Sequence, residues 1–156
     1  AGGALGTGND HMLYRTLIGR ESEPTVVEVE KGAIRRFAEA LGDPSPLALD
    51  EAAARAAGHA GLVAPPTFAV TLGWSERFRH SLDLGTRSVL HGEQSFEYAR
   101  PIVSGDRLTI RSRVADVQER AGASGPMDVI VIEDEGRDDK GALVFKARAT
   151  MILRRG

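Results

Sequence analysis

The side chains best suited to chemistry are a carboxylate and an imidazole between residues 41 and 68. The Asp43 carboxylate and the His59 imidazole can each donate or accept a proton. These are the side-chain types that general acid–base catalysis uses. Each also has a structural interpretation, because an aspartate after a helix often closes a turn and a histidine in a loop often does no chemistry. Asp43 is therefore a candidate for a weak or vestigial acid. His59 is a lower-ranked candidate, as a histidine that could act as the base if no other base is present.

A second imidazole, His91, lies in a stretch with strand character from Val89 to Ala99. Simple alternation along a strand places His91 on the polar face with Glu93 and opposite Phe96. Gly92 could allow a β-bulge that turns the histidine toward a different direction. Two roles stay open for His91, an alternative catalytic residue and a structural hydrogen-bonding group.

Three consecutive segments resemble one known family. The sequence GDPSPLA from Gly42 to Ala48 resembles the hydratase motif of MaoC-like hot-dog proteins, Gly-Asp-x-Asn-Pro-Leu-His. The stretch from Asp50 to Gly58 is similar to the helix that follows this motif in the family. The sequence VAPPTF from Val63 to Phe68 falls where the hydratases carry Ile-x-His-Gly-Met, at the start of their central helix.

A later stretch resembles one branch of the family, the N-terminal MaoC-like dehydratase domain. It comprises HGEQSFEY from His91 to Tyr98, followed by Arg100-Pro101 and Gly105-Asp106. The combined resemblance covers nearly everything from Gly19 to Arg154. It implies an α+β hot-dog fold, in which an antiparallel sheet wraps a long central helix and two copies pair into a double hot dog.

The resemblance also implies an activity. Family members hydrate trans-2-enoyl thioesters of coenzyme A or acyl carrier protein, or dehydrate (3R)-hydroxyacyl thioesters. This chemistry needs an acid and a base on one face of the substrate, together with N–H donors for the developing enolate oxygen. It needs no cofactor and no metal. The resemblance implies an Asp and a His from one loop, and N–H donors from the start of the central helix.

The sequence departs from that pattern at the site itself. Asp43 matches the family's aspartate, but Ala48 occupies the position of the histidine, and Ser45 replaces the asparagine. Pro65 and Pro66 occupy the helix start, and proline has no N–H to donate. We therefore expect this chain to form the half of a double hot dog that binds the acyl chain. It would pair either with a second copy of itself or with a second MaoC-like subunit that keeps the histidine.

The expected acyl-binding residues follow from the same resemblance. Phe68, Val70, Leu72 and Trp74 are candidates to line an acyl tunnel, although a stripe of this kind is often plain core. The full set of expected substrate-binding residues is Ser45, Ala64, Thr67, Phe68, Trp74 and Gln94.

Two other functions remain as alternatives. A hot-dog acyl-CoA thioesterase would activate water with a carboxylate on or near the central helix, where only Glu76 is available, late and beside Arg77. The second alternative is a non-catalytic module that binds acyl thioesters. Such a module needs neither the histidine nor the N–H donors that Pro65 and Pro66 lack.

The hydrophobic patterns supply the elements that would position these residues. Apolar residues at helical spacing predict a helix from Lys31 to Leu41, and Asp50 is a suitable N-cap for a second helix through Ala57. The apolar stretch from Phe68 to about Phe78 predicts a third, mostly buried helix. Strand-like stretches lie near 25–29, 89–99, 108–118, 127–133 and 142–153, so the pattern favours an α+β fold with an antiparallel sheet.

Composition narrows the function classes further. The chain has 156 residues, a net charge of −2 and no cysteine. Thiol nucleophiles and cysteine metal sites are therefore excluded, and no charge excess favours nucleic acid or anionic membranes. Residues 1–11 are interpreted as a remnant of an expression tag or cloning site, and residues 12–156 as a single domain. We expect a cytoplasmic protein that is at least dimeric.

Overall fold

The computed structural model describes residues 12, 14–84, 89–123 and 125–154; the expected cloning remnant lies outside the described residues. The elements in chain order are β1 (Thr25–Glu28), α2 (Lys31–Leu41), α3 (Pro46–Leu49), α4 (Glu51–Ala56), the 3-10 helix η1 (Phe68–Thr71), α5 (Glu76–Ser81), β2 (Val89–Tyr98), β3 (Arg107–Gly122), β4 (Gly125–Arg137) and β5 (Leu143–Arg154). The predicted α+β class is confirmed.

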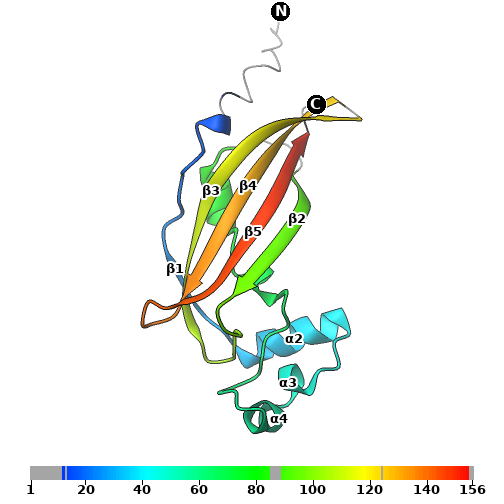
Figure 1. Ribbon diagram of the computed structural model, residues 1–156, viewed down its shortest axis with the longest axis vertical. Coiled ribbons are helices and arrows are strands. Elements are labelled where there is room, and N and C mark those ends of the chain that lie inside the picture. The colour runs from blue at the N-terminus through cyan, green and yellow to red at the C-terminus, as the bar shows by residue number, and fades with distance from the viewer. Residues whose placement is uncertain (1–11, 13, 85–88, 124, 155–156) are drawn as a thin grey trace, which may run out of the picture.

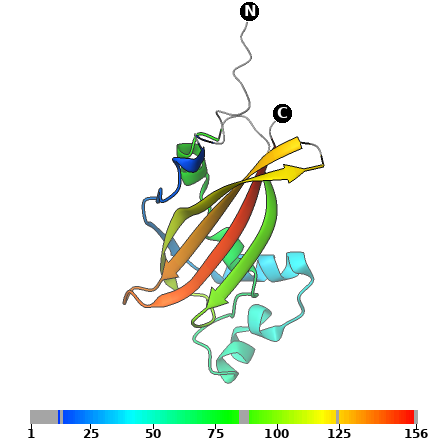
Figure 2. The same cartoon turned by 45° about the horizontal axis from the view of Figure 1, so that its top comes forward.

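The strands form one antiparallel sheet in the order β1-β3-β4-β5-β2. Strands β1 and β2 are therefore its two edges. Figure 1 shows the long strands running side by side, with α2, α3 and α4 gathered at one end of the sheet. Figure 2 shows the curvature of the sheet and α2 lying behind it. The face that carries the helices is called the inner face below.

Alternation along the strands separates the two faces of the sheet. On β5, Phe145, Ala147 and Ala149 are buried on the inner face, while Lys146 and Arg148 are exposed on the outer face. Burying one large apolar side chain contributes about 1.5–3 kcal/mol, which pins the register of each strand.

The inner face carries two apolar clusters. The first core lies against α2, α3 and η1 and includes Ile34, Ala48, Phe68 and Phe145. The second core lies against α5 and includes Phe78, Val114, Ile130 and Met151. The buried polar residues Ser112, Asp128 and Asp134 belong to neither apolar cluster.

The first two helices form as predicted. Helix α2 ends at Gly42, whose φ of 68° is the left-handed conformation that glycine tolerates best. Asp50 caps α4, because its side chain accepts hydrogen bonds from the N–H groups of Ala52 at 2.8 Å and Ala53 at 3.4 Å. These caps fix the segment from 42 to 50, which contains the short helix α3, between α2 and α4.

The prediction of one continuous helix over Phe68–Phe78 is wrong. The segment consists of η1, a break at residues 72–75 and a separate helix α5. Ser75 starts α5 by accepting a hydrogen bond from the N–H of Phe78 at 3.2 Å. The long central helix that the family resemblance implies is thus divided into two short pieces. No described helix is long and apolar enough to span a membrane.

Candidate functional site

The loop after α2 holds the candidate acid in a turn. Oδ1 of Asp43 accepts a hydrogen bond from the backbone N–H of Ser45 at 2.9 Å, and the N–H of Asp43 donates to the carbonyl of Ala38. This is the side-chain-to-backbone turn that aspartate commonly forms after a helix. Asp43 and Ser45 are both half-buried. The carboxylate therefore has a structural role here, and its catalytic role stays a prediction.

Ala48, which takes the place of the family's histidine, lies within α3. Its side chain is 2% exposed and belongs to the first core. Within the stretch from Leu41 to Leu49, Asp43 is the only side chain that can titrate. The loop therefore offers one half of an acid–base pair.

The segment Val63–Thr67 has few free N–H groups. The N–H of Ala64 donates to the carbonyl of Ile102 at 2.9 Å. The N–H of Phe68 donates to the carbonyl of Pro65, also at 2.9 Å. Pro65 and Pro66 have no N–H. Ala64, Pro65, Pro66 and Phe68 therefore offer no unused backbone N–H to an enolate oxygen.

An apolar cavity of about 350 Å³ lies beside the two prolines, between residues 63–66 and 98–102. The Tyr98 hydroxyl closes one side by donating a hydrogen bond to the carbonyl of Pro66. Partial burial raises the pKa of this hydroxyl above its ordinary value. Arg100 reaches the cavity but is held by Asp106, through two hydrogen bonds of 2.8 and 3.0 Å.

A second apolar hollow of about 390 Å³ lies between α2, β1 and η1, and is called the Phe37 groove. Phe37 and Phe68 form one wall in an edge-to-face contact, with ring centroids 5.5 Å apart. Its lining residues are Val27, Glu28, Val29, Glu30, Ala33, Arg36, Phe37, Ala40, Phe68, Thr71 and Leu72. Charged residues are few among them, so the groove suits an apolar chain.

The four expected tunnel residues do not gather at one place. Phe68 and Leu72 line the Phe37 groove. Val70 is 42% exposed, and Trp74 packs at the second core against Phe78, with ring centroids 6.2 Å apart. The break between η1 and α5 separates Trp74 from Phe68. Thr67 occupies the N-cap position of η1 without a side-chain capping hydrogen bond, and it is exposed.

A β-bulge reverses the expected orientation of His91. The register of β2 against β5 shifts between His91 and Glu93, so that Gly92 is the extra residue. A Cβ at Gly92 would lie 2.9 Å from Cδ1 of Ile152, so glycine suits this close approach. His91 pairs with Met151, whose buried side chain lies on the inner face.

Paired residues on neighbouring strands share a face, so His91 lies on the inner face. Phe96, which pairs with Ala147, lies on that face too. Placing His91 opposite Phe96 by simple alternation was therefore wrong, and the bulge that Gly92 suggested is the reason. His91 is exposed at the free edge of β2. Gln94 is anchored there, because Nε2 donates to the carbonyl of Arg148 at 3.2 Å.

The other candidate ionisable groups lie away from both apolar hollows. His59 is half-buried in the loop after α4, where its N–H donates to the carbonyl of Ala54. His80 is exposed near the end of α5, 3.9 Å from the carboxylate of Glu76. The Glu76 side chain is itself 76% exposed in the first turn of α5. A thioesterase carboxylate would have to work at this solvent-exposed position.

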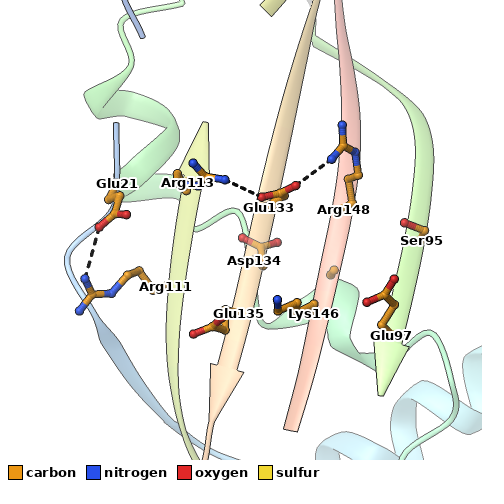
Figure 3. A pocket seen from close by; sticks show the side chains of 11 residues that line it. Glu21, Ser95, Glu97, Arg111, Arg113, Glu133, Asp134, Glu135, Lys146 and Arg148 are labelled. Atoms are coloured by element: carbon orange, nitrogen blue, oxygen red, sulfur yellow. Dashed lines mark hydrogen bonds and ion pairs between the residues drawn. The ribbon is translucent and has the colours of Figure 1, made fainter. Parts of the chain in front are cut away.

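The outer face of the sheet carries cross-strand ion pairs over a hollow of about 470 Å³ (Figure 3). Arg113 and Arg148 donate to the two oxygens of Glu133, at 2.9 and 2.7 Å. Arg111 donates to Glu21 at 3.3 Å. The arginines on this face are thus matched by carboxylates, as on a solvated sheet face. Among the described residues, no cluster of three or more His, Asp or Glu side chains could hold a metal ion.

Asp134, a buried carboxylate on the inner face, is not among the residues predicted from the sequence. Asp134 is 6% exposed, and its Oδ1 accepts hydrogen bonds from the Ser112 hydroxyl and from the N–H of Trp74, the latter at 3.3 Å. Burial raises the pKa of Asp134, and the two hydrogen bonds partly oppose this. A charged residue at an inward position of the strand was the available signal, because strand alternation places Asp134 on the same face as Ile130 and Ile132.

Comparison with known proteins identifies the family. The model of the FAS1-like dehydratase domain region matches residues 16–147. The chain belongs to this family. Two sequence relatives, both named UPF0336 protein, come from Streptomyces griseus subsp. griseus and Saccharopolyspora erythraea. Each is 40% identical over 147 residues, which cover 91% of this chain and 95% and 92% of the relatives.

Solved structures show the same fold. The (3R)-hydroxyacyl-ACP dehydratase complex HadBC of Mycobacterium tuberculosis matches with a TM-score of 0.75 and 28% identity, covering 87% of this chain and 96% of the solved chain. A MaoC-like dehydratase matches with a TM-score of 0.80 and 28% identity, covering 90% of this chain but 43% of the solved one. The predicted hot-dog fold and MaoC-like family are confirmed, and the chain is a relative of the MaoC-like dehydratases.

Proposed function

We propose that this chain is the acyl-binding, catalytically incomplete half of a (3R)-hydroxyacyl-thioester dehydratase or trans-2-enoyl-thioester hydratase. The observation that carries the proposal is Ala48, buried in the first core where the family motif has its histidine. Proton abstraction beside a thioester needs a base, and Asp43 alone cannot act as both acid and base in one step. The engaged N–H groups around Pro65 and Pro66 support the same conclusion.

The Phe37 groove supplies the proposed acyl site. Its volume of about 390 Å³ lies within the usual range of small-molecule sites, about 300–1,000 Å³. Each methylene that an acyl chain buries there contributes about 0.8 kcal/mol. Glu28, Glu30 and Arg36 are among the lining residues, and they add polar groups to a wall that is otherwise mostly apolar.

The free edge of β2 supplies the proposed partner site. An unpaired edge strand exposes N–H and C=O groups that a second sheet can satisfy. Strand β2 also has exposed apolar side chains, Leu90 and Tyr98, each with more than a third of its surface accessible. The HadBC complex is a named assembly of this type of dehydratase, and it supports a second MaoC-like subunit as the partner of this chain.

A matched pair of variants tests acyl binding. Ala40 and Ala56 are both exposed alanines in the last turn of a short helix, but Ala40 lines the Phe37 groove and Ala56 does not. Ala40→Glu introduces a carboxylate into the groove, whereas Ala56→Glu makes the same change outside it. Calorimetric titration with dodecanoyl-CoA should show binding by the parent and Ala56→Glu, and at least tenfold weaker binding by Ala40→Glu. Equal binding by all three would contradict the groove assignment.

The two alternatives give different results in the same preparation. A thioesterase would release free thiol from dodecanoyl-CoA, and Glu76→Gln would abolish that release. A purely non-catalytic acyl-binding module would bind dodecanoyl-CoA but remain inactive toward trans-2-enoyl-CoA even with a histidine-containing MaoC-like subunit added. The proposal requires turnover to appear when such a subunit is added.

A further inference from the structure

The buried carboxylate of Asp134 is tied to the backbone of the central segment. Its Oδ1 accepts hydrogen bonds from the Ser112 hydroxyl and from the N–H of Trp74. Ser112 is 3% exposed and is itself fixed, because its N–H donates to the hydroxyl of Ser22 at 3.0 Å. A carboxylate is costly to bury without hydrogen bonds, so this arrangement has to offset a substantial desolvation penalty.

This contact interrupts a helix. In a continuous α-helix the N–H of Trp74 would donate to the carbonyl of Val70, four residues earlier. Here Asp134 takes that donor, and Trp74 has a φ of 50°, in the left-handed region. A Cβ on residue 73 would overlap the Asp134 carboxylate, so only glycine fits beside it. The break is therefore a built feature of the inner face.

The break adjoins the Phe37 groove. Leu72, the residue directly before Gly73, lines the groove, while Trp74 directly after it packs at the second core. Two short helices with a left-handed residue between them cannot share one axis, so η1 is free to lie at an angle to α5. In a continuous helix, Leu72 and the turns that follow it would share one helix axis. Leu72 would then lie at a different place in the wall of the Phe37 groove, and the end of the groove would have a different shape.

We propose that Asp134, held by Ser112, is a positioning residue that fixes the break at Gly73–Trp74 and thereby sets the length of acyl chain that the Phe37 groove accepts. This inference rests on the proposed acyl-binding function. Asp134 does not itself contact the acyl chain in this scheme. It acts through the backbone of Trp74 and the placement of Leu72.

The test compares three variants of the full chain. Asp134→Leu removes the acceptor for Trp74, whereas Asp134→Asn keeps an oxygen that can accept from Trp74 and from Ser112. Val114→Ala, in the second core on the same strand as Ser112, is the control for a general loss of stability. Calorimetry with butyryl-CoA and dodecanoyl-CoA gives the ratio of the two affinities for each variant.

The expected result is selective. Asp134→Leu should lower the dodecanoyl-to-butyryl affinity ratio by about tenfold, which corresponds to about 1.4 kcal/mol. Asp134→Asn should keep the ratio within about twofold of the parent, and Val114→Ala should lower the melting temperature without moving the ratio. An unchanged ratio in Asp134→Leu, or a fall in Val114→Ala as large as in Asp134→Leu, would overturn the inference.

Hydrogen exchange separates this inference from the proposed function. Peptides covering residues 70–76 should exchange differently in Asp134→Leu than in the parent, with or without ligand, because the Trp74 amide loses its acceptor. If the parent binds neither thioester, the proposed function fails and the chain-length role fails with it. If the parent binds both thioesters but exchange over residues 70–76 is the same in Asp134→Leu, only the positioning role is overturned.

Discussion

The carboxylate of Asp134 accepts a hydrogen bond from the N–H of Trp74, 60 residues earlier in the chain, at 3.3 Å. The contact joins the C-terminal part of strand β4 to the point where the central helix of the fold is interrupted. It places a charged residue on the inner face, between the core that adjoins the Phe37 groove and the core beneath α5.

Replacing the glycine beside this carboxylate should destabilise the protein. Gly73→Ala would force a Cβ into the Asp134 carboxylate, and such overpacking costs about 1–3 kcal/mol. The matched control is Gly32→Ala inside α2, where a Cβ meets only the flexible end of Arg36 at 3.1 Å. The control should raise stability by about 0.5–1 kcal/mol, because alanine favours a helix over glycine. Urea denaturation of both variants measures these changes, and equal effects would contradict the close approach.

The raised pKa of Asp134 has a consequence for stability against pH. Because burial raises the pKa, the folded state holds the proton more tightly than the unfolded state does. The stability from this group is fully present below the unfolded pKa, about 3.9, and is lost as the pH rises through the folded pKa. Asp134→Asn removes this dependence.

The stability of Asp134→Asn relative to the parent should therefore increase as the pH rises from about 4 to about 7. Thermal denaturation of both proteins at several pH values measures this difference. A difference that stays constant over the range would mean that the folded protein does not raise the pKa of Asp134.

The ion pairs of the outer face should stabilise the sheet modestly and depend on salt. Glu133→Gln removes the charge that Arg113 and Arg148 share, and should cost about 0.5–1 kcal/mol at low ionic strength and less at high salt. Glu28→Gln removes a looser pair, 3.9 Å from Arg107, and should cost close to nothing. Denaturant titrations at two salt concentrations test both variants. A salt-independent loss in Glu133→Gln would point to packing instead.

Local patterns predicted most of the helices and strands. The apolar spacing of Ile34 and Ala38 in α2, the Asp50 cap and the alternation of Phe145 and Ala147 in β5 all act within a few residues, and the structure agrees with each. These features depend on neighbours along the chain, which a sequence displays directly.

The differences arose from contacts between distant segments. The stretch 68–78 has the low charge of a buried helix, but Asp134 on β4 takes the N–H that would continue it. The face of His91 depends on a bulge against β5, which alternation along β2 alone does not contain. Gly73 and Gly92 were the available signals at both points, because each marks a close approach of the backbone to another strand.

The candidate site could be predicted only in outline. The motif around Asp43 showed which side chain is missing at Ala48, and the structure adds that this alanine is core. The Phe37 groove joins residues of β1, α2 and η1, three segments with no shared motif, so pattern analysis found only Phe68 and Leu72 of its walls.

The most direct test of the central claim is hydration of short and long trans-2-enoyl-CoA esters by the full chain alone, followed through loss of the conjugated-thioester absorbance. An active MaoC-like hydratase serves as the positive control. The account predicts no turnover above the buffer rate, because Ala48 leaves the site without its base. Robust turnover by the chain alone would contradict the account, and loss of that turnover in His91→Ala or His59→Ala would identify the base.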